Sequence, residues 1–248
     1  MIVEHLRYSE KCQIIAELGT LHHHSLESLK RATKDCLDAG ADYVKIQVID
    51  EACAWWADKK AIERYERFEV KGFGYRKYFD WVKAEGLWER VFASYFDVTS
   101  LKLYGDVPLI KLGHKTIWMP GLIREASQMG QGVIISLGDD ERSAWARGFC
   151  YDLDPNRTTF FYQFVQPVYP TFHSDVRIPL FGSQWEGLSL HCRHPRAIRG
   201  AFLMGALTLE IHVKGIDADG PDCEFALSLD QLKEAVKDRD FVGEVVSQ

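Results

Sequence analysis

Eight short apolar segments, each of the length of a buried β-strand, recur along the chain. They are rich in β-branched and aromatic residues and are separated by turn residues and helical patterns. The segments lie at 12–18, 42–49, 91–96, 109–113, 132–138, 158–165, 187–191 and 208–213. Eight strands that alternate with helices in a chain of 248 residues match the element count and size of a (β/α)₈ barrel. We therefore predict this fold, and a doubly wound open sheet is the alternative.

The segments between the strands carry helical patterns that end at glycines. We expect helices over 25–39, 75–85, 121–129, 140–147 and 195–204. Ser228 and Gln231 have capping-box spacing, which predicts that a last helix starts at Ser228. The segments 97–106 and 173–182 are predicted to form short or irregular helices.

The chain contains no Pro/Ser-rich linker, internal repeat or low-complexity tract, which predicts a single domain over residues 1–248. The longest departure from the strand and helix pattern is the segment 50–75, which is rich in charged and aromatic residues. In a barrel it would follow the carboxyl end of the second strand, where substrate loops occur. It is therefore a candidate active-site loop.

The net charge of −6 and the isoelectric point near 5.9 provide no bulk attraction for nucleic acid or anionic lipid. The expected partner is a small molecule or a second copy of the chain. The first 18 residues contain acids that interrupt their apolar run, which argues against a signal peptide or membrane span. The six cysteines include no CxxC pair, so we expect reduced thiols and a cytoplasmic protein.

Polar residues in the strand tails are the candidates for chemistry, because the active site of such a barrel lies at the carboxyl ends of its strands. In the last strand, Glu210, His212 and Lys214 share one face. The other tails contribute Glu17, Lys45, Gln47, Ser94, Asp97, Lys111, Ser136, Gln163, Gln166, Ser189 and His191. A barrel interior tolerates an isolated ion pair, but polar tails on all eight strands indicate a functional site.

Two kinds of site are possible at these strand ends. His191 and His212 end consecutive strands and could share a divalent cation, although a single strand histidine is usually held by a hydrogen bond. Lys45 and Lys111 could bind a phosphate and a carboxylate, or act as structural ion-pair partners. Glu17 could bind a hydroxyl group, relay a proton or pair with Lys45.

Several stretches together resemble the N-acetylneuraminate (sialic acid) synthase family. The segment "IIAELGTLHHHSLESLKRATKDCLDAGADYVKIQ" resembles that family's opening, with its A-E-I-G strand, N-H-N-G loop, A-G-A-D turn and V-K-F-Q strand. Further on, "GLSLH" is similar to G-Y-S-D-H, "LEIHV" to I-E-K-H-F, and "GPDCEFALSLDQL" to G-P-D-H-x-F-S-L-x-x-x-E-L. The similar segments follow the family's order over nearly the whole chain.

The resemblance implies a (β/α)₈ barrel that condenses phosphoenolpyruvate with a sugar aldehyde and uses Mn²⁺ or Mg²⁺, with zinc less expected. By position it implies that Glu17 faces the sugar, that Lys45 and Lys111 bind phosphoenolpyruvate, and that His191 and His212 bind the metal. The predicted catalytic residues are these five. The predicted substrate-binding residues are His22, Gln47, Ser94, Ser136, Ser189 and Asp222.

The chain also departs from the family pattern. The glutamate of the family's S-G-E has no counterpart in "LGHKT", and N-H-N-G is replaced by "LHHH". We also expect the protein to lack the family's C-terminal antifreeze-like domain. We therefore expect an acceptor other than N-acetylmannosamine, or a separate polypeptide that supplies the missing contacts, and we expect a homo-oligomer. The alternatives are a metal-dependent hydrolase or isomerase, and an inactive barrel that serves as a binding partner.

Overall fold

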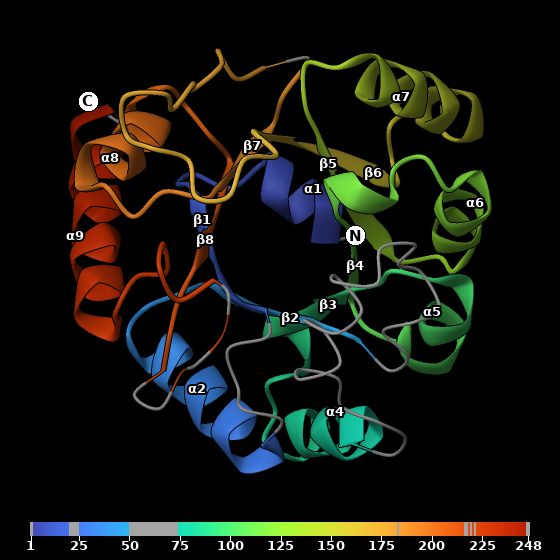
Figure 1. Cartoon of the computed structure of the whole chain (residues 1–248), viewed down its shortest axis with the longest axis horizontal. Helices are drawn as coiled ribbons and strands as arrows, with labels where there is room; N and C mark the ends of the chain where they lie inside the picture. The colour runs from blue at the N-terminus through green and yellow to red at the C-terminus, as the bar shows by residue number, and fades with distance from the viewer. Residues whose placement is uncertain are drawn as a thin grey trace.

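The strands form a closed barrel in which all neighbours are parallel and follow one another in chain order (Figure 1). The computed structural model describes residues 2–19, 25–49, 74–182, 184–215, 218, 220 and 222–246. The strands in these residues are β1 (Gln13–Gly19), β2 (Tyr43–Gln47), β3 (Val91–Ser94), β4 (Leu109–Leu112), β5 (Gly132–Leu137), β6 (Phe160–Val165), β7 (Gly187–Leu190) and β8 (Thr208–His212). The predicted (β/α)₈ barrel is confirmed, and the open sheet is excluded.

Most helices surround the barrel, and the first helix lies at its centre in the view of Figure 1. The α-helices and the two short 3₁₀ helices of the described residues are α1 (Ile2–Arg7), α2 (Leu26–Asp38), α4 (Gly74–Ala84), η2 (Trp88–Arg90), α5 (Val98–Tyr104), η3 (His114–Thr116), α6 (Pro120–Gln128), α7 (Glu141–Leu153), α8 (Pro195–Leu203) and α9 (Leu229–Val246). The capping box before α9 is formed in both directions. The Ser228 amide donates to Gln231 Oε1 at 2.9 Å, and the Gln231 amide donates to Ser228 Oγ at 3.2 Å.

Two helix predictions were wrong. Helix α7 does not end before Gly148 but continues to Leu153, because Cys150 beyond the glycine is buried against the core and this packing outweighs glycine's poor helix propensity. The segment 173–182 forms a turn followed by irregular chain. Pro179 disfavours the helical conformation in the residue before it, and the Gln166 side chain holds the segment by accepting from the Arg177 amide at 2.6 Å. No described helix combines the length and the apolar character needed to cross a bilayer.

The inward-facing side chains of the strands form an apolar layer and a polar layer. Side chains two residues apart point to the same face of a strand, so Tyr43, Lys45 and Gln47 of β2 all point into the barrel. The same spacing pairs an apolar and a polar residue on other strands: Ile15 with Glu17, Phe92 with Ser94, Leu109 with Lys111, Ile134 with Ser136, and Phe161 with Gln163. The polar layer lies at the carboxyl ends of the strands.

Helix α1 closes the amino-terminal end of the barrel. Its side chains Val3 and Leu6 are completely buried and pack against the apolar inner layer. The approach to β5 is so close that a Cβ on Gly132 would lie 2.4 Å from Cγ2 of Val3. The Arg7 guanidinium then donates to Glu186 Oε1 at 2.5 Å, which fixes the helix to the segment before β7. This short helix was not predicted, and it leaves the polar layer open only toward the carboxyl ends.

Candidate functional site

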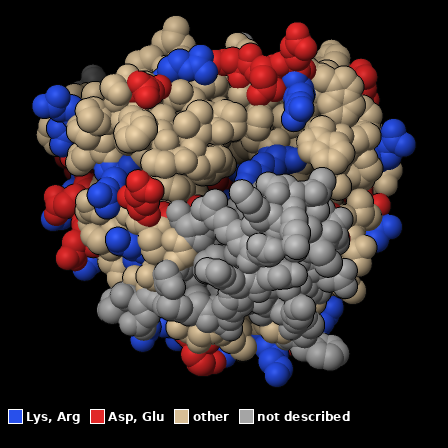
Figure 2. Space-filling model, in the orientation of Figure 1, with Lys and Arg blue, Asp and Glu red and all other residues tan. Residues whose placement is uncertain are grey.

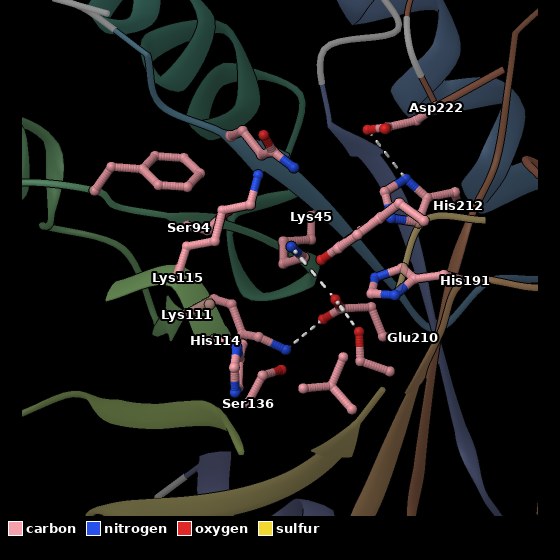
Figure 3. Close-up of a pocket in the computed structure, with 16 residues that line it drawn as sticks. Lys45, Ser94, Lys111, His114, Lys115, Ser136, His191, Glu210, His212 and Asp222 are labelled. Carbon is pink, nitrogen blue, oxygen red and sulfur yellow. Dashed lines mark hydrogen bonds and ion pairs between the residues drawn. The ribbon is translucent and has the colours of Figure 1, made fainter. Parts of the chain in front are cut away.

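A pocket opens at the carboxyl ends of the strands (Figure 3). One basic patch is visible near the centre of this face, and acidic and basic side chains mix around its rim (Figure 2). The residues that line the pocket are Lys45, Gln47, Ser94, Phe96, Lys111, Gly113, His114, Lys115, Ser136, Val165, Tyr169, Ser189, His191, Glu210, His212 and Asp222. Every predicted site residue except Glu17 and His22 therefore lines this pocket.

Glu17, His22 and the candidate loop 50–75 are the predicted parts of the site that are not among the lining residues. Glu17 is completely buried beneath the pocket and accepts a hydrogen bond from Gln47 Nε2 at 3.0 Å. His22 lies outside the described residues. So does most of the candidate loop 50–75, of which only the last two residues are described, as the start of α4.

Two acids and two lysines form a buried network at the floor of the pocket. Lys45 pairs with Glu17, and its Nζ lies 3.5 Å from Glu210 Oε1. Lys111 Nζ lies 2.7 Å from Glu210 Oε2. Glu210 also accepts from Ser189 Oγ at 2.9 Å, and Lys111 also donates to Gln163. Each buried charge thus has opposite charges and hydrogen bonds around it, which keeps the network in one geometry.

The four charged groups of the network differ in pKa because burial and Coulomb attraction oppose each other. Burial lowers the pKa of Lys111 to about 8, although Glu210 acts in the other direction. Burial also disfavours the charge on Lys45, but Glu17 and Glu210 together raise its pKa above the ordinary value. Burial raises the pKa of Glu17 to about 7 against the attraction of Lys45. Burial opposes ionisation of Glu210, yet Lys111 and Lys45 hold its pKa below the ordinary value.

The imidazoles of His191 and His212 face each other above this network, with ring centres 5.5 Å apart (Figure 3). His191 Nδ1 lies 3.1 Å from the carbonyl oxygen of Gln166. A carbonyl can only accept, so this nitrogen carries the proton and Nε2 keeps its lone pair. Within the described residues, His212 Nδ1 is buried without a hydrogen-bond partner, and it lies 3.6 Å from Asp222 Oδ2. Burial lowers the pKa of both imidazoles to about 3, so both are neutral at neutral pH.

These features fit a divalent cation. Neutral imidazoles are the form that binds metals, and a ligating histidine commonly donates its other ring nitrogen to a carbonyl, as His191 does to Gln166. Among the described residues, the buried His212 Nδ1 has no hydrogen-bond partner, and the Asp222 carboxylate lies 3.6 Å from it. Within the described residues no group of three such side chains is close enough to form a metal centre. The protein therefore offers two imidazoles, and further ligands would come from Asp222, water or substrate.

Aromatic rings hold the two imidazoles in place. The Tyr169 ring lies 3.9 Å from the His191 ring, centre to centre, and the Phe225 ring lies 4.8 Å from the His212 ring. On the opposite wall, His114 Nε2 lies 2.7 Å from Asp140 Oδ2, and Lys115 extends into the pocket (Figure 3). The imidazole pair is thus packed on one side and faces His114 and Lys115 on the other.

Sequence reasoning named Glu210 as a strand-tail candidate on the same face as His212 but gave it no role, and it missed two other side chains of the site. Tyr169 lies in the segment "QPVYP", which is similar to the C-T-S-E-Y-P segment of the sialic acid synthase family, but nothing in the sequence places its ring on His191. Lys115 falls beside the position of the missing glutamate, and only the structure places it in the pocket wall.

The fold and the pocket define a (β/α)₈ barrel with a small ligand site, lined mostly by polar residues and built around buried lysines and paired imidazoles. The chain belongs to the NeuB family, whose sequence profile matches residues 33–247. This confirms the predicted resemblance. A comparison with curated protein sequences finds no significant match.

Solved structures with the same fold are distant in sequence. The N-acetylneuraminic acid (sialic acid) synthetase of Leptospira borgpetersenii is 20% identical with a TM-score of 0.83, and the match covers 96% of this chain and 86% of that chain. The spore coat polysaccharide biosynthesis protein spsE of Bacillus subtilis is 20% identical with a TM-score of 0.75, covering 96% and 70%. A truncated 3-deoxy-D-arabino-heptulosonate 7-phosphate synthase of Thermotoga maritima is 13% identical with a TM-score of 0.64, covering 96% and 88%. At these levels of sequence identity, the structural similarity shows a shared fold.

Proposed function

We propose that this protein condenses phosphoenolpyruvate with an aldehyde acceptor and forms a 2-keto-3-deoxy acid and phosphate. The observation that carries the proposal is the pair of buried lysines, Lys45 and Lys111, at the floor of a pocket that also holds two neutral imidazoles. Phosphoenolpyruvate carries a phosphate and a carboxylate, and two fixed cations suit these two groups. Membership of the NeuB family and the fold shared with a sialic acid synthetase support the same reaction.

The two lysines have donors to spare for a ligand. An ammonium group has three N–H donors. In the described part of the chain, Glu17 and Glu210 are the partners of Lys45, while Gln163 and Glu210 are those of Lys111. This leaves one donor of each lysine for the anionic groups of phosphoenolpyruvate. The serine hydroxyls of the pocket add neutral donors beside them, from Ser94, Ser136 and Ser189.

His191 and His212 would hold a divalent cation, with Asp222 and water as oxygen ligands. Nitrogen and oxygen ligands together suit Mn²⁺, and Mg²⁺ is the other candidate. When bound, the cation supplies a Lewis acid for the aldehyde oxygen. Tyr169 and Phe225 pack against the imidazoles and restrict their rotation. Gln47 lines the pocket on the side of Lys45 and would bind a hydroxyl group of the acceptor, while Glu17 beneath it accepts from Gln47 Nε2 and would fix its orientation.

In the proposed reaction the methylene carbon of phosphoenolpyruvate forms a carbon–carbon bond to the aldehyde carbon, whose oxygen becomes a hydroxyl group. Water adds to the carbon that bears the phosphate. The bond from this carbon to the phosphate oxygen then breaks, which leaves a ketone and inorganic phosphate. The overall reaction consumes one phosphoenolpyruvate, one aldehyde and one water. The lysines would keep the phosphate and the carboxylate in one orientation while the charge shifts.

Phosphate release tests the proposal. The purified chain is incubated with phosphoenolpyruvate, Mn²⁺ and a panel of aldoses and N-acyl amino sugars, with chelator and acceptor-free reactions as controls. We expect metal-dependent release with at least one acceptor, and a Lys45→Met variant that loses it. The absence of both phosphoenolpyruvate binding and turnover across the panel would refute the proposal. Hydrolysis of another substrate under those conditions would favour a metal-dependent hydrolase, which needs the imidazoles but gives the buried lysines no role.

A further inference from the structure

His114 forms an imidazole–carboxylate pair with Asp140 in the wall of the pocket. His114 lies in η3, directly after β4, and its side chain lines the pocket opposite His191 and His212 (Figure 3). Asp140 lies between β5 and α7, and its Oδ2 is 2.7 Å from His114 Nε2. Since β4 and β5 are neighbours in the barrel, the pair joins the carboxyl ends of two adjacent strands.

The hydrogen bond fixes which nitrogen of His114 carries the proton. Burial opposes ionisation of Asp140, but the Ser143 amide and His114 hold the pKa of its carboxyl group below the ordinary value. The carboxylate is therefore ionised at neutral pH and can only accept, so Nε2 of His114 donates and Nδ1 keeps its lone pair. In the part of the chain that the structure describes, the His114 side chain makes no other hydrogen bond. Nδ1 is thus the basic nitrogen that the pair offers to a ligand.

Asp140 is itself held in place. Its Oδ1 accepts from the Ser143 amide at 2.8 Å, which caps the amino end of α7. Ser143 Oγ in turn accepts from the Gly138 amide at 2.8 Å. A Cβ at Gly138 would lie 3.1 Å from Asp140 Oδ2 and 3.5 Å from His114 Nε2, so the glycine leaves the space that the pair occupies. The pair is therefore oriented before any ligand binds, which favours proton transfer.

The other ionisable groups of the pocket have different tasks in the proposed function. Of the three imidazoles among the described lining residues, His191 and His212 would hold the cation. The two acids at the pocket floor share the buried ammonium groups. His114 is three residues beyond Lys111, and Figure 3 shows both side chains on the same wall of the pocket. Phosphoenolpyruvate bound to Lys111 would therefore meet an imidazole that has no other partner for its Nδ1 among the described residues.

We propose that His114 transfers the proton of the water that adds to phosphoenolpyruvate, and that Asp140 positions the imidazole. Nδ1 takes one proton from this water as the water oxygen bonds to the carbon that bears the phosphate. The imidazolium then gives that proton to the phosphate oxygen as the bond from the carbon to this oxygen breaks. The second proton of the water leaves when the ketone forms, and it balances the proton that the aldehyde oxygen takes up. The inference rests on the proposed function, to which it adds an acid–base group.

The first experiment removes the imidazole. Phosphate release is measured for the unmodified chain and for His114→Ala, with an acceptor that the unmodified chain converts, and with and without added imidazole. We expect His114→Ala to lower kcat by about 100- to 10,000-fold. The Kd for phosphoenolpyruvate, measured by titration calorimetry, should change by less than about twofold, because the imidazole acts in the reaction step. Added imidazole should raise the rate of the variant by about tenfold or more, and substituted imidazoles should raise it further as their basicity increases.

The second experiment tests the carboxylate. Asp140→Asn keeps a good N-cap for α7 but removes the charge that orients His114. Asp97→Asn is the matched control, because Asp97 caps α5 by accepting from the Ser100 amide at 2.8 Å and is not among the lining residues of the pocket. We expect Asp140→Asn to lower kcat by about tenfold or more and Asp97→Asn to change it by less than about twofold. The double variant His114→Ala/Asp140→Asn should be no slower than His114→Ala, because Asp140 acts through His114.

The outcomes separate the inference from the proposed function. A kcat of His114→Ala within about tenfold of the unmodified chain, or a loss that added imidazole does not reduce, would overturn the inference and leave the proposed function standing. If circular dichroism shows that His114→Ala does not fold, the comparison of Asp140→Asn with Asp97→Asn decides, and equal rates would overturn the inference. If the unmodified chain consumes no phosphoenolpyruvate with any acceptor, the proposed function fails, and the inference fails with it.

Discussion

Replacement of Glu210 by glutamine tests whether the buried charges at the pocket floor hold one another in place. Glu210 is 4% exposed and bridges two lysines, with Oε2 2.7 Å from Lys111 Nζ and Oε1 3.5 Å from Lys45 Nζ. Glutamine has nearly the same shape but no charge. In the variant, Glu17 is the one carboxylate of the described network that faces the two buried ammonium groups.

The size of the effect follows from this geometry. Removing one partner of a buried ion pair costs about 3–5 kcal/mol, because the remaining charge is left uncompensated. The glutamine oxygen can still accept from Ser189 or Lys111, so we expect the lower end, about 3 kcal/mol. For a chain of this size that lowers the unfolding midpoint temperature by roughly 10 °C.

The free energy of unfolding is measured in urea for the unmodified chain, Glu210→Gln, Lys111→Met and the double variant. The double variant lacks both charges of one pair, so it should be less destabilised than the sum of the single variants by about 1–3 kcal/mol. Glu234→Gln removes the same charge from an exposed pair with Lys237 and should cost less than about 0.5 kcal/mol. A loss for Glu210→Gln as small as this control, or strict additivity, would refute the reasoning.

Three further predictions concern the imidazole pair, the pKa of Lys111 and helix α1. His191→Ala and His212→Ala should each abolish Mn²⁺ binding, measured by titration calorimetry, and activity, with unchanged circular dichroism; activity that survives both changes and chelation would rule out the metal site. The pKa of Lys111 is about 8 in the folded state and near its ordinary value of 10.5 in the unfolded state. Between these two pH values the unfolded chain binds more protons than the folded chain, so the contribution of Lys111 to the free energy of unfolding rises with pH. The stability difference between the unmodified chain and Lys111→Met should therefore shift in favour of the unmodified chain over this range, and a constant difference would contradict the lowered pKa. Leu6→Ala in α1 should cost about 2–5 kcal/mol because Leu6 is completely buried, whereas Tyr8→Ala, at a residue 83% exposed, should cost less than about 0.5 kcal/mol; equal losses in urea unfolding would show that α1 does not close the barrel.

The sequence was sufficient for the barrel and for most of the pocket because both depend on local periodicity. A period of two places Lys45 on the same face as Tyr43 and Gln47, and the parallel order of the strands brings Lys111, His191 and His212 to the same end. These relations need no knowledge of distant contacts, so strand-tail residues could be chosen as candidates from the sequence alone, whereas Asp222 was chosen from the resemblance to the sialic acid synthase family.

The features that sequence reasoning missed depend on contacts between distant segments. Helix α1 has only six residues, too few for a clear pattern, and its stability comes from packing beneath the barrel. The extension of α7 beyond Gly148 likewise depends on burial of Cys150. Tyr169 comes to His191 because its segment folds back over the barrel end, where the Thr171 amide donates to the His191 carbonyl at 3.0 Å. No pattern in a single sequence predicts this contact between Tyr169 and His191.

Helix α1 and the apolar inner layer close the amino-terminal end of the barrel, so among the described residues the pocket opens at the carboxyl ends of the strands. The buried lysines lie at the floor of this pocket, while Lys115 and Tyr169 lie nearer its opening. This arrangement affects the order in which two substrates can bind. If phosphoenolpyruvate binds at the pocket floor as proposed, an acceptor that is already bound above it would block its access. The two substrates would then have to bind in a fixed order, phosphoenolpyruvate first. The phosphate formed at the floor could dissociate only after the keto acid had left the pocket.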